Sequence, residues 1–169
     1  DDTRVYFENF LVLNGNFTVS LWAKIDYQYT SSLLFLGDNK DAFQWLFQYA
    51  PTFLSLKTPD QGNLQISSPL SYDWVQLTFV CGENISIYKN GILQIQINRT
   101  TNPFLNGQGN RLSIGHYISG PSSTTCADSY FDDIYLIDRA LNTEEVQQLF
   151  IDSDNDQLSD WIEINLYLT

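Results

Sequence analysis

The chain has 169 residues, of which 43% are hydrophobic and 15% aromatic. This composition is sufficient for one domain with a large buried core and excludes a disordered chain. Twenty acidic residues against eight lysines and arginines give a formal net charge of −12. This balance argues against nucleic acids and disfavours anionic membrane surfaces as partners, because phosphate binding requires clustered basic residues. No apolar run is long enough to span a membrane, so membrane insertion is not expected.

Apolar and polar residues alternate with a period of two along most of the chain, which indicates half-buried strands. In the first clear example, Phe17, Val19 and Leu21 share one face and Thr18 and Ser20 share the other. Asn90-Gly91 joins two such segments and is the preferred two-residue hairpin turn, because both residues tolerate positive φ. The segments predicted as strands are residues 17–25, 33–36, 43–49, 53–56, 64–66, 75–80, 85–89, 92–97, 111–115 and 131–137.

One short helix is predicted near the end of this pattern, from Thr143 to Phe150. Asn142 precedes it as an N-cap, and Glu145 stands three residues later in a capping-box arrangement. About ten short strands and one helix predict an all-β, antiparallel sandwich or barrel, since each strand must bury one face against another sheet.

Five segments in this order resemble laminin G-like, concanavalin A-like jelly rolls. They are residues 14–25, 72–80, 87–93, 111–115 and 131–146. The resemblance covers roughly residues 4–150 and implies a two-sheet antiparallel jelly-roll sandwich, typical of extracellular adhesion, lectin and pentraxin-like modules. We therefore expect a jelly-roll domain over residues 1–150 and a separate appendage over residues 151–169.

The appendage contains an acidic loop of twelve residues, 152–163. Acidic side chains stand at positions 1, 3, 5, 9 and 12, and position 7 can offer a backbone carbonyl, as in loops that bind Ca²⁺. The predicted ligands are Asp152, Asp154, Asp156, Leu158, Asp160 and Glu163. Gln157 departs from the pattern, because position 6 usually requires glycine. A solvated acidic turn would explain the charge but not the spacing.

The same loop resembles thrombospondin type 3 repeats and related calcium repeats of bacterial surface proteins. Beyond it, Ile164, Leu166 and Leu168 alternate with polar residues as in a strand. An orphan apolar strand at a terminus can add to the sheet edge of a neighbouring subunit, which predicts a homo-oligomer or fibre. The alternatives are that this segment folds back on its own sheet or leads into a further repeat.

The jelly-roll resemblance implies a second calcium site. In such folds the aspartate that opens the corresponding strand often binds structural Ca²⁺ with backbone carbonyls, a role that falls here to Asp132 with Gly37 as carbonyl donor. An ordinary turn-capping aspartate is the alternative. Asp38, Asn39 and Asp41 form another oxygen-rich loop, for which solvated turn residues are the favoured interpretation.

The cysteine count and the glycosylation motifs are compatible with a secreted protein. Cys81 and Cys126 are the only cysteines, and an even, low count favours one disulfide over two buried thiols. Sequons occur at Asn16, Asn84 and Asn98. The expected location is extracellular or at a cell surface.

Catalysis is poorly supported by the sequence. Related glycoside hydrolases need two nearby carboxylates. The Glu-x-Asp-x-Glu strand motif that provides them is absent from this sequence. His116, the only histidine, alternates with Leu112 and Ile114 and is expected to be a packed or rim residue. We therefore predict a non-enzymatic, calcium-binding module for adhesion or assembly, with glycoside hydrolysis as a remote alternative.

A lectin-like module that binds a glycan or a surface protein is the other alternative to a structural subunit. Trp22, Trp45 and Trp74 are candidates for stacking on sugar rings. Packing in the core is the more common role of a strand tryptophan.

Overall fold

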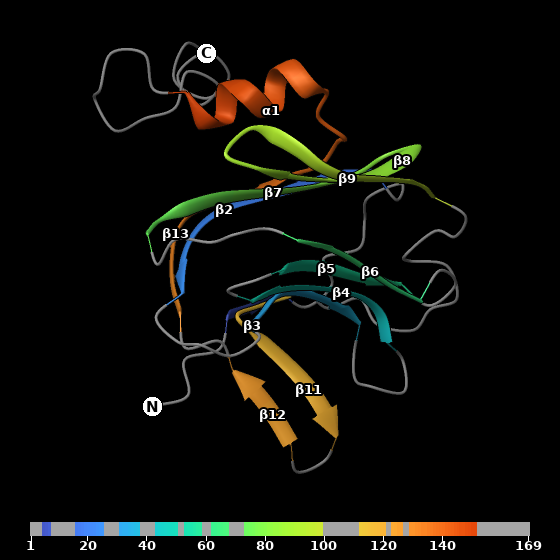
Figure 1. Cartoon of the computed structure of the whole chain (residues 1–169), viewed down its shortest axis with the longest axis vertical. Coiled ribbons are helices and arrows are strands. Elements are labelled where there is room, and N and C mark those ends of the chain that lie inside the picture. The colour runs from blue at the N-terminus through green and yellow to red at the C-terminus, as the bar shows by residue number, and fades with distance from the viewer. Residues whose placement is uncertain are drawn as a thin grey trace. The chain divides into compact units, whose positions relative to one another are not determined.

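The structure is a computed structural model that describes residues 5–7, 16–25, 31–37, 43–50, 53–58, 62–67, 73–99, 112–120, 123–126 and 129–151. Its elements are β1 (Val5–Phe7), β2 (Phe17–Ile25), β3 (Ser31–Gly37), β4 (Phe43–Ala50), β5 (Phe53–Thr58), β6 (Gly62–Ser67), β7 (Val75–Cys81), β8 (Asn84–Lys89), β9 (Ile92–Asn98), β10 (Leu112–Ile114), β11 (His116–Gly120), β12 (Ser123–Cys126), β13 (Ser129–Ile137) and α1 (Thr143–Phe150) (Figure 1).

The chain forms two compact units. The first comprises Asp1–Gly15, Lys24–Trp74 and Thr100–Tyr130, and the second comprises Asn16–Ala23, Val75–Arg99 and Phe131–Thr169. The first contains a six-stranded sheet of order β1-β10-β3-β4-β5-β6 and the β11–β12 hairpin, which contacts β3 (Figure 1). The second is built on a five-stranded sheet of order β13-β2-β7-β8-β9.

The sheet of the second unit has a large apolar face. Phe17, Val19 and Leu21 are at most 3% exposed, as the alternation of β2 predicts. The ring of Phe17 lies 5.7 Å from the ring of Phe79. Phe79 is on β7 and is the register partner of Val19 on β2. Burying these apolar side chains stabilises the folded unit by about 25 cal/mol for each Å² of apolar surface removed from water.

Helix α1 covers the other face of the same sheet (Figure 1). Val146 and Leu149 are buried in a cluster with Val80, Tyr88 and Leu141. Strand β7 is therefore buried along its whole length, on both faces. Three hydroxyl-bearing residues lie on the sheet face that α1 covers, and each is at most 1% exposed: Thr18, Ser20 and Thr78.

Hydrogen bonds compensate for burying these polar groups. Thr18 Oγ1 donates to the carbonyl of Arg139 at 2.8 Å and accepts from the backbone N–H of Leu141 at 3.0 Å. The hydroxyls of Ser20 and Thr78 lie 3.0 Å apart. Gln76 Nε2 donates to the carbonyl of Leu149, in the last turn of the helix, at 2.9 Å. The helix is thus attached to the sheet by directional bonds as well as by apolar packing.

The two local predictions for this unit are confirmed. Asn142 and Glu145 form the capping box at the start of α1, and the helix has the predicted bounds. Asn90 and Gly91 form the two-residue turn between β8 and β9 with φ values of 50° and 71°. A Cβ on Gly91 would lie 3.4 Å from the Cα of Gln147, so this turn also lies against α1.

Three strands were not predicted, β1, β11 and β12. The predicted strand 111–115 is shorter in the structure, because Gly115 has a φ of 73° and separates β10 from β11. His116 therefore opens a different strand from Leu112 and Ile114, and its predicted alternation with them is wrong. The all-β class is confirmed, with two antiparallel main sheets and one short helix in the described part, as in a jelly roll.

Candidate functional site

A row of polar residues crosses four strands of the six-stranded sheet. The antiparallel registers pair Ser32 with Gln48, Gln48 with Ser55, and Ser55 with Gln65. Residues paired in this way lie on the same face of a sheet. Ser32, Gln48, Ser55 and Gln65 therefore form one continuous line across β3, β4, β5 and β6, which we call the polar row.

A second row runs beside the polar row on the same face. Its members are Ser113, Phe35, Leu46, Lys57 and Asn63, which pair in that order across β10, β3, β4, β5 and β6. This row places an aromatic residue, one cation and one amide next to the amides and hydroxyls of the polar row. Among the described side chains of this row, Ser113 is 5% exposed, Lys57 is half-buried and Asn63 is exposed.

The opposite face of this sheet is apolar. Leu34, Phe47, Leu56 and Leu64 stand in one register line on it. Leu54 and Leu56 are fully buried there, at 0% exposure. The polar row consequently lies on the face of the sheet opposite to Leu54 and Leu56.

Solvent reaches the polar face at strand β6. Asn63 and Gln65 are exposed, whereas Leu64 between them is half-buried. Ser55, opposite Gln65, is 0% exposed, and its Oγ has no hydrogen-bond partner in the structure. Buried hydroxyls are normally bonded, so this unpartnered group requires an explanation.

Few charges lie in the described strands. Within the described strands, acidic residues occur only in β13, as Asp132 and Asp133. The strands of the six-stranded sheet and of the β11–β12 hairpin contain none, and Lys57 is the only lysine or arginine in these described strands. A strongly acidic protein thus carries a nearly uncharged sheet face, which suits a polar ligand without formal charge.

Sequence reasoning did not find this face. Ser32, Gln48, Ser55 and Gln65 are separately unremarkable polar members of alternating strands. Their alignment depends on the register of four strands, which period-two alternation leaves undetermined. The available signal was that the polar positions of these strands contain amides and hydroxyls but no carboxylates.

Asp132, predicted to bind Ca²⁺ with Gly37, lies exposed in β13 of the second unit, while Gly37 ends β3 in the first. Asp132 Oδ1 accepts the backbone N–H of Asp133 at 3.0 Å, and Asp133 has a φ of 46°. Burial, and then the charge of Asp132, raise the pKa of the Asp133 carboxyl. These contacts fit the turn-like alternative, and pairing with Gly37 stays a prediction.

The predicted calcium loop and terminal strand lie outside the described residues. This applies to Asp152, Asp154, Asp156, Leu158, Asp160, Glu163, Ile164, Leu166 and Leu168, and to Asp38, Asn39 and Asp41. Across the part of the chain that the structure describes, no three His, Cys, Asp or Glu side chains gather as metal ligands would. The same part contains no helix long and apolar enough to cross a membrane.

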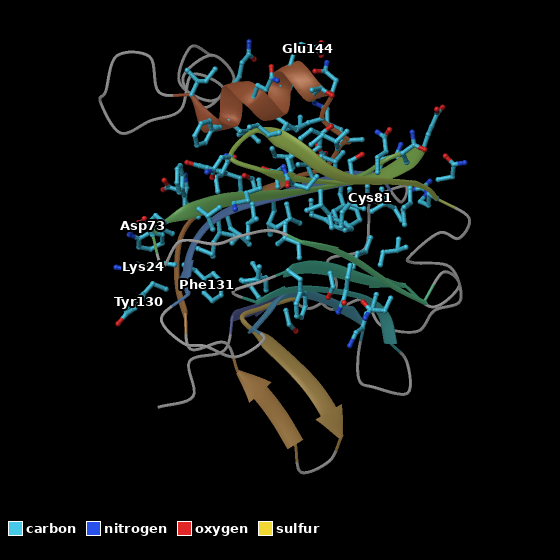
Figure 2. All side chains as sticks on the ribbon, in the orientation of Figure 1. Lys24, Asp73, Cys81, Tyr130, Phe131 and Glu144 are labelled. Atoms are coloured by element: carbon cyan, nitrogen blue, oxygen red, sulfur yellow. The ribbon has the colours of Figure 1, made fainter. Side chains whose placement is uncertain are left out.

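Cys81 is fully buried at the end of β7 (Figure 2), and its Sγ lies 3.4 Å from Nη1 of Arg99. Burial raises the pKa of this thiol in its reduced form, and Arg99 partly opposes the shift. Cys126 ends β12 in the other unit, and its side chain is outside the described set. The disulfide between them therefore stays a prediction.

The three sequons lie at one end of the second unit's sheet. Asn84 and Asn98 are register partners on β8 and β9, and exposed Asn16 precedes β2. Arg99 Nη1 donates to Asn16 Oδ1 at 3.2 Å. The sequons thus gather in space although 82 residues separate the first from the last; glycosylation itself stays a prediction.

The three candidate tryptophans differ in their surroundings. Trp22 lies in the second unit and packs against Phe150 of α1, with ring centroids 5.9 Å apart. Trp45 pairs with Leu36 in register on the apolar face of the six-stranded sheet. Trp74 is 43% exposed. Trp22 therefore has the packing role that is usual for a strand tryptophan, and Trp74 retains an exposed ring.

Comparison with known proteins identifies the class. Residues 1–147 match the family model described as the concanavalin A-like lectin/glucanases superfamily, Laminin_G_3. The match covers most of the chain, so this protein belongs to that family. No curated protein sequence matches significantly.

Solved structures give the same fold at low sequence identity. The native heptameric SAP-like pentraxin from Limulus polyphemus is similar with a TM-score of 0.62 and 18% identity, covering 88% of this chain and 76% of the pentraxin. A botulinum neurotoxin type C structure, described as dependent on two ganglioside molecules for cell entry, has a TM-score of 0.58 and 16% identity over 80% of this chain. The match covers 35% of the toxin chain, so our chain spans about a third of its length.

Proposed function

We propose that this chain is a non-enzymatic carbohydrate-recognition module of an extracellular or cell-surface protein. The observation that carries the proposal is the nearly uncharged face of the six-stranded sheet, with its polar row, in a chain of net charge −12. Sugar hydroxyls both donate and accept hydrogen bonds, as do the amides and hydroxyls of this row. Membership in a lectin and glucanase superfamily supports the same assignment.

The structural neighbours give further support. One toxin neighbour is described as interacting with gangliosides and another was solved with a partner called SialylT. These ligands belong to the toxins, and at 16% identity only the fold is common to both. The fold does not determine function, so the assignment to this chain depends on its own residues.

Recognition without catalysis is favoured by the positions of the carboxylates. Glycoside hydrolysis requires two carboxyl groups on either side of the scissile bond. The strands that form the polar face contain no aspartate or glutamate in the described residues. A sugar bound on that face would meet amides, hydroxyls and one lysine, which hold a ligand but provide no acid and nucleophile pair.

A calcium-stabilised building block for adhesion or assembly is the second candidate. The spacing of acids in residues 152–163 favours it, together with the apolar alternation in residues 164–168. Both functions are compatible in one protein, since the sugar face and the acidic loop use different residues. Ca²⁺ would be bound by Asp152, Asp154, Asp156, the Leu158 carbonyl, Asp160 and Glu163.

A glycan array tests the main proposal. The whole chain should bind a defined subset of immobilised glycans in millimolar Ca²⁺, without altering their mass after prolonged incubation. Retention of no glycan by correctly folded protein would reject carbohydrate recognition, and release of a shorter sugar would reject the non-enzymatic assignment.

Thermal unfolding with Ca²⁺ and with a chelator tests the second candidate. A site that binds Ca²⁺ only in the folded state should add about 2.7 kcal/mol of stability at a hundredfold excess over Kd. Asp154→Asn with Asp156→Asn should remove the effect of the loop, whereas Asp132→Asn should leave it. A melting temperature that does not change when the chelator is added would rule out both predicted calcium sites.

Light scattering and negative-stain microscopy test assembly. Deleting residues 164–169 should convert calcium-dependent oligomers or fibres into monomers. Unchanged mass distributions for the intact and shortened chains would contradict the role given to Ile164, Leu166 and Leu168.

A further inference from the structure

We propose that an exposed apolar patch at the end of helix α1 is the docking site for Trp161 and Ile162 of this chain's own acidic segment. Four residues form what we call the α1-end patch: Trp22, Leu93, Phe150 and Ile151. The inference rests on the second candidate function, the calcium loop, and deepens it, because docking would fix that loop against the sheet of the second unit.

The patch is continuous around the last turn of α1. The ring of Phe150 lies 5.9 Å from the ring of Trp22 on β2. Toward β9, a Cβ on Gly91, in the turn beneath the helix (Figure 1), would lie 3.4 Å from the Cβ of Phe150. Leu93 follows on β9 and is the register partner of Tyr88, which packs in the cluster under α1. The patch therefore extends from β2, past the helix end, to β9.

The apolar side chains of the patch are open to solvent. Leu93 is 42% exposed, Phe150 38% and Ile151 43%. Val146 and Leu149 on the same helix are at most 2% exposed, so α1 has already buried the side that faces its sheet. Single exposed apolar residues are ordinary, whereas several neighbouring ones mark a surface that another segment or molecule contacts.

The chain itself provides the nearest apolar groups. Ile151 is extended, and its N–H donates to the carbonyl of Gln147 at 3.1 Å, which fixes the point where the chain leaves the helix. Residues 152–160 are mostly polar, and Trp161 and Ile162 follow them. Short tethers give a local concentration of about millimolar. A segment tethered at Ile151 therefore competes well against separate molecules for the patch.

Closure of the acidic loop on Ca²⁺ would return Trp161 to the start of the loop. Asp152 and Glu163, at positions 1 and 12, would ligate one ion at about 2.3–2.6 Å, so their oxygens would lie within about 5 Å of each other. Trp161 and Ile162 occupy positions 10 and 11, which are not ligand positions in this pattern. Their side chains are then available to contact the patch beside Ile151.

The charges around the helix end make docking depend on calcium. The last turn of α1 contains no basic residue, and the carbonyl end of a helix carries a partial negative charge. Residues 152–163 add five carboxylates directly after this end. Their repulsion opposes docking until a cation is bound. Because such coupling is reciprocal, docking raises the calcium affinity by the factor by which calcium favours docking.

Calcium titration calorimetry of the whole chain tests the docking. Leu93→Thr and Trp161→Ala should each weaken the calcium affinity of the loop by roughly three- to tenfold, as expected for removing a few buried methylene groups. Neither side chain can ligate Ca²⁺, so a change in affinity reports contact.

Ile92→Thr is the matched control. Ile92 is 65% exposed and is the register partner of Lys89, whereas Leu93 is the partner of Tyr88. The two neighbours therefore lie on opposite faces of β9, and only Leu93 is on the face that α1 covers. Ile92→Thr should leave the calcium affinity unchanged.

Two further variants separate contact from folding. Trp161→Phe should retain most of the affinity, because phenylalanine keeps an aromatic ring for the patch. Leu93→Thr combined with Trp161→Ala should bind calcium about as weakly as the worse single variant, since both changes remove one contact. Losses that multiply in the combined variant would show two independent effects and would overturn the contact. Urea unfolding in chelator should be the same for Trp161→Ala and the wild type.

The outcomes distinguish this inference from the proposed functions. Wild-type calcium affinity in Leu93→Thr, with loss in Asp154→Asn plus Asp156→Asn, would reject the docking and leave the calcium loop standing. Absence of calcium binding by the loop would reject both. Affinity restored by mixing Leu93→Thr with Trp161→Ala would place the segment on a second copy and overturn docking within one chain. The glycan array decides carbohydrate recognition separately.

Discussion

Replacing Thr18 by valine should destabilise the second unit by about 2 kcal/mol. The hydroxyl of Thr18 is fully buried and bonds two backbone groups more than 120 residues away, the carbonyl of Arg139 and the N–H of Leu141. Valine has the same shape but offers neither bond. Arg139 is exposed, so water can replace its lost donor, but Leu141 is 4% exposed and would keep an unpaired N–H.

The magnitude follows from these environments. An unsatisfied buried donor costs about 1–3 kcal/mol, and a lost bond to a solvated carbonyl costs little in addition. Urea unfolding followed by tryptophan fluorescence would give the free energy of unfolding, and an unchanged m-value would show that the same surface is exposed in both proteins.

Ser20 and Thr78 provide the control for Thr18. Their hydroxyls bond each other at 3.0 Å, so Ser20→Ala with Thr78→Val removes both partners and leaves no group unsatisfied. That double variant should change stability by less than about 1 kcal/mol. The reasoning is refuted if Thr18→Val unfolds within about 0.5 kcal/mol of the wild type, or if the double variant is the more damaging of the two.

Three further predictions concern the helix cap and β13. Asn142→Ala should cost about 1 kcal/mol of unfolding free energy in the same urea assay, because Asn142 Oδ1 would no longer accept the Glu145 N–H. Asp133→Asn should raise the free energy of unfolding in calcium-free buffer at neutral pH by a few tenths of a kcal/mol, since the amide removes a charge that burial and Asp132 both disfavour and suits positive φ. A lower free energy of unfolding would contradict this. The hydrogen bond from Arg139 holds the pKa of Glu145 below its usual range, so this carboxylate contributes stability above about pH 4.3, its unfolded value, and loses it as pH falls through the folded pKa. Because both side chains are partly exposed, the contribution should be under about 1 kcal/mol. Arg139→Met should reduce it in a stability profile measured between about pH 3 and 7, whereas the bond from the Asn142 N–H to Glu145 remains.

Features encoded by neighbouring residues were predictable from the sequence. The capping box depends on Asn142 and Glu145, three positions apart, and the hairpin turn on the adjacent pair Asn90-Gly91. The apolar face of β2 likewise follows from alternation over nine residues. In each case one short stretch contains both the groups and their partners.

Features that depend on distant residues were not predictable. Alternation placed Thr18 and Ser20 on one polar face, but it did not show that α1 covers that face or that Arg139 and Leu141, just before the helix, are the partners of Thr18. The β11–β12 hairpin lacks a strong apolar alternation, and a change of backbone at Gly115 separates it from β10. The polar row exists only once four strands have adopted their registers.

The bond from Gln76 to Leu149 has a mechanical consequence. Strand β7 is the middle strand of its five-stranded sheet, and Gln76 links it directly to the last turn of α1. Along the backbone, α1 is preceded by β13, which is an edge strand of the sheet. Tension applied to the chain beyond Ile151 would therefore have to break the Gln76 bond and the packing of Val146 and Leu149 before it reached that edge strand.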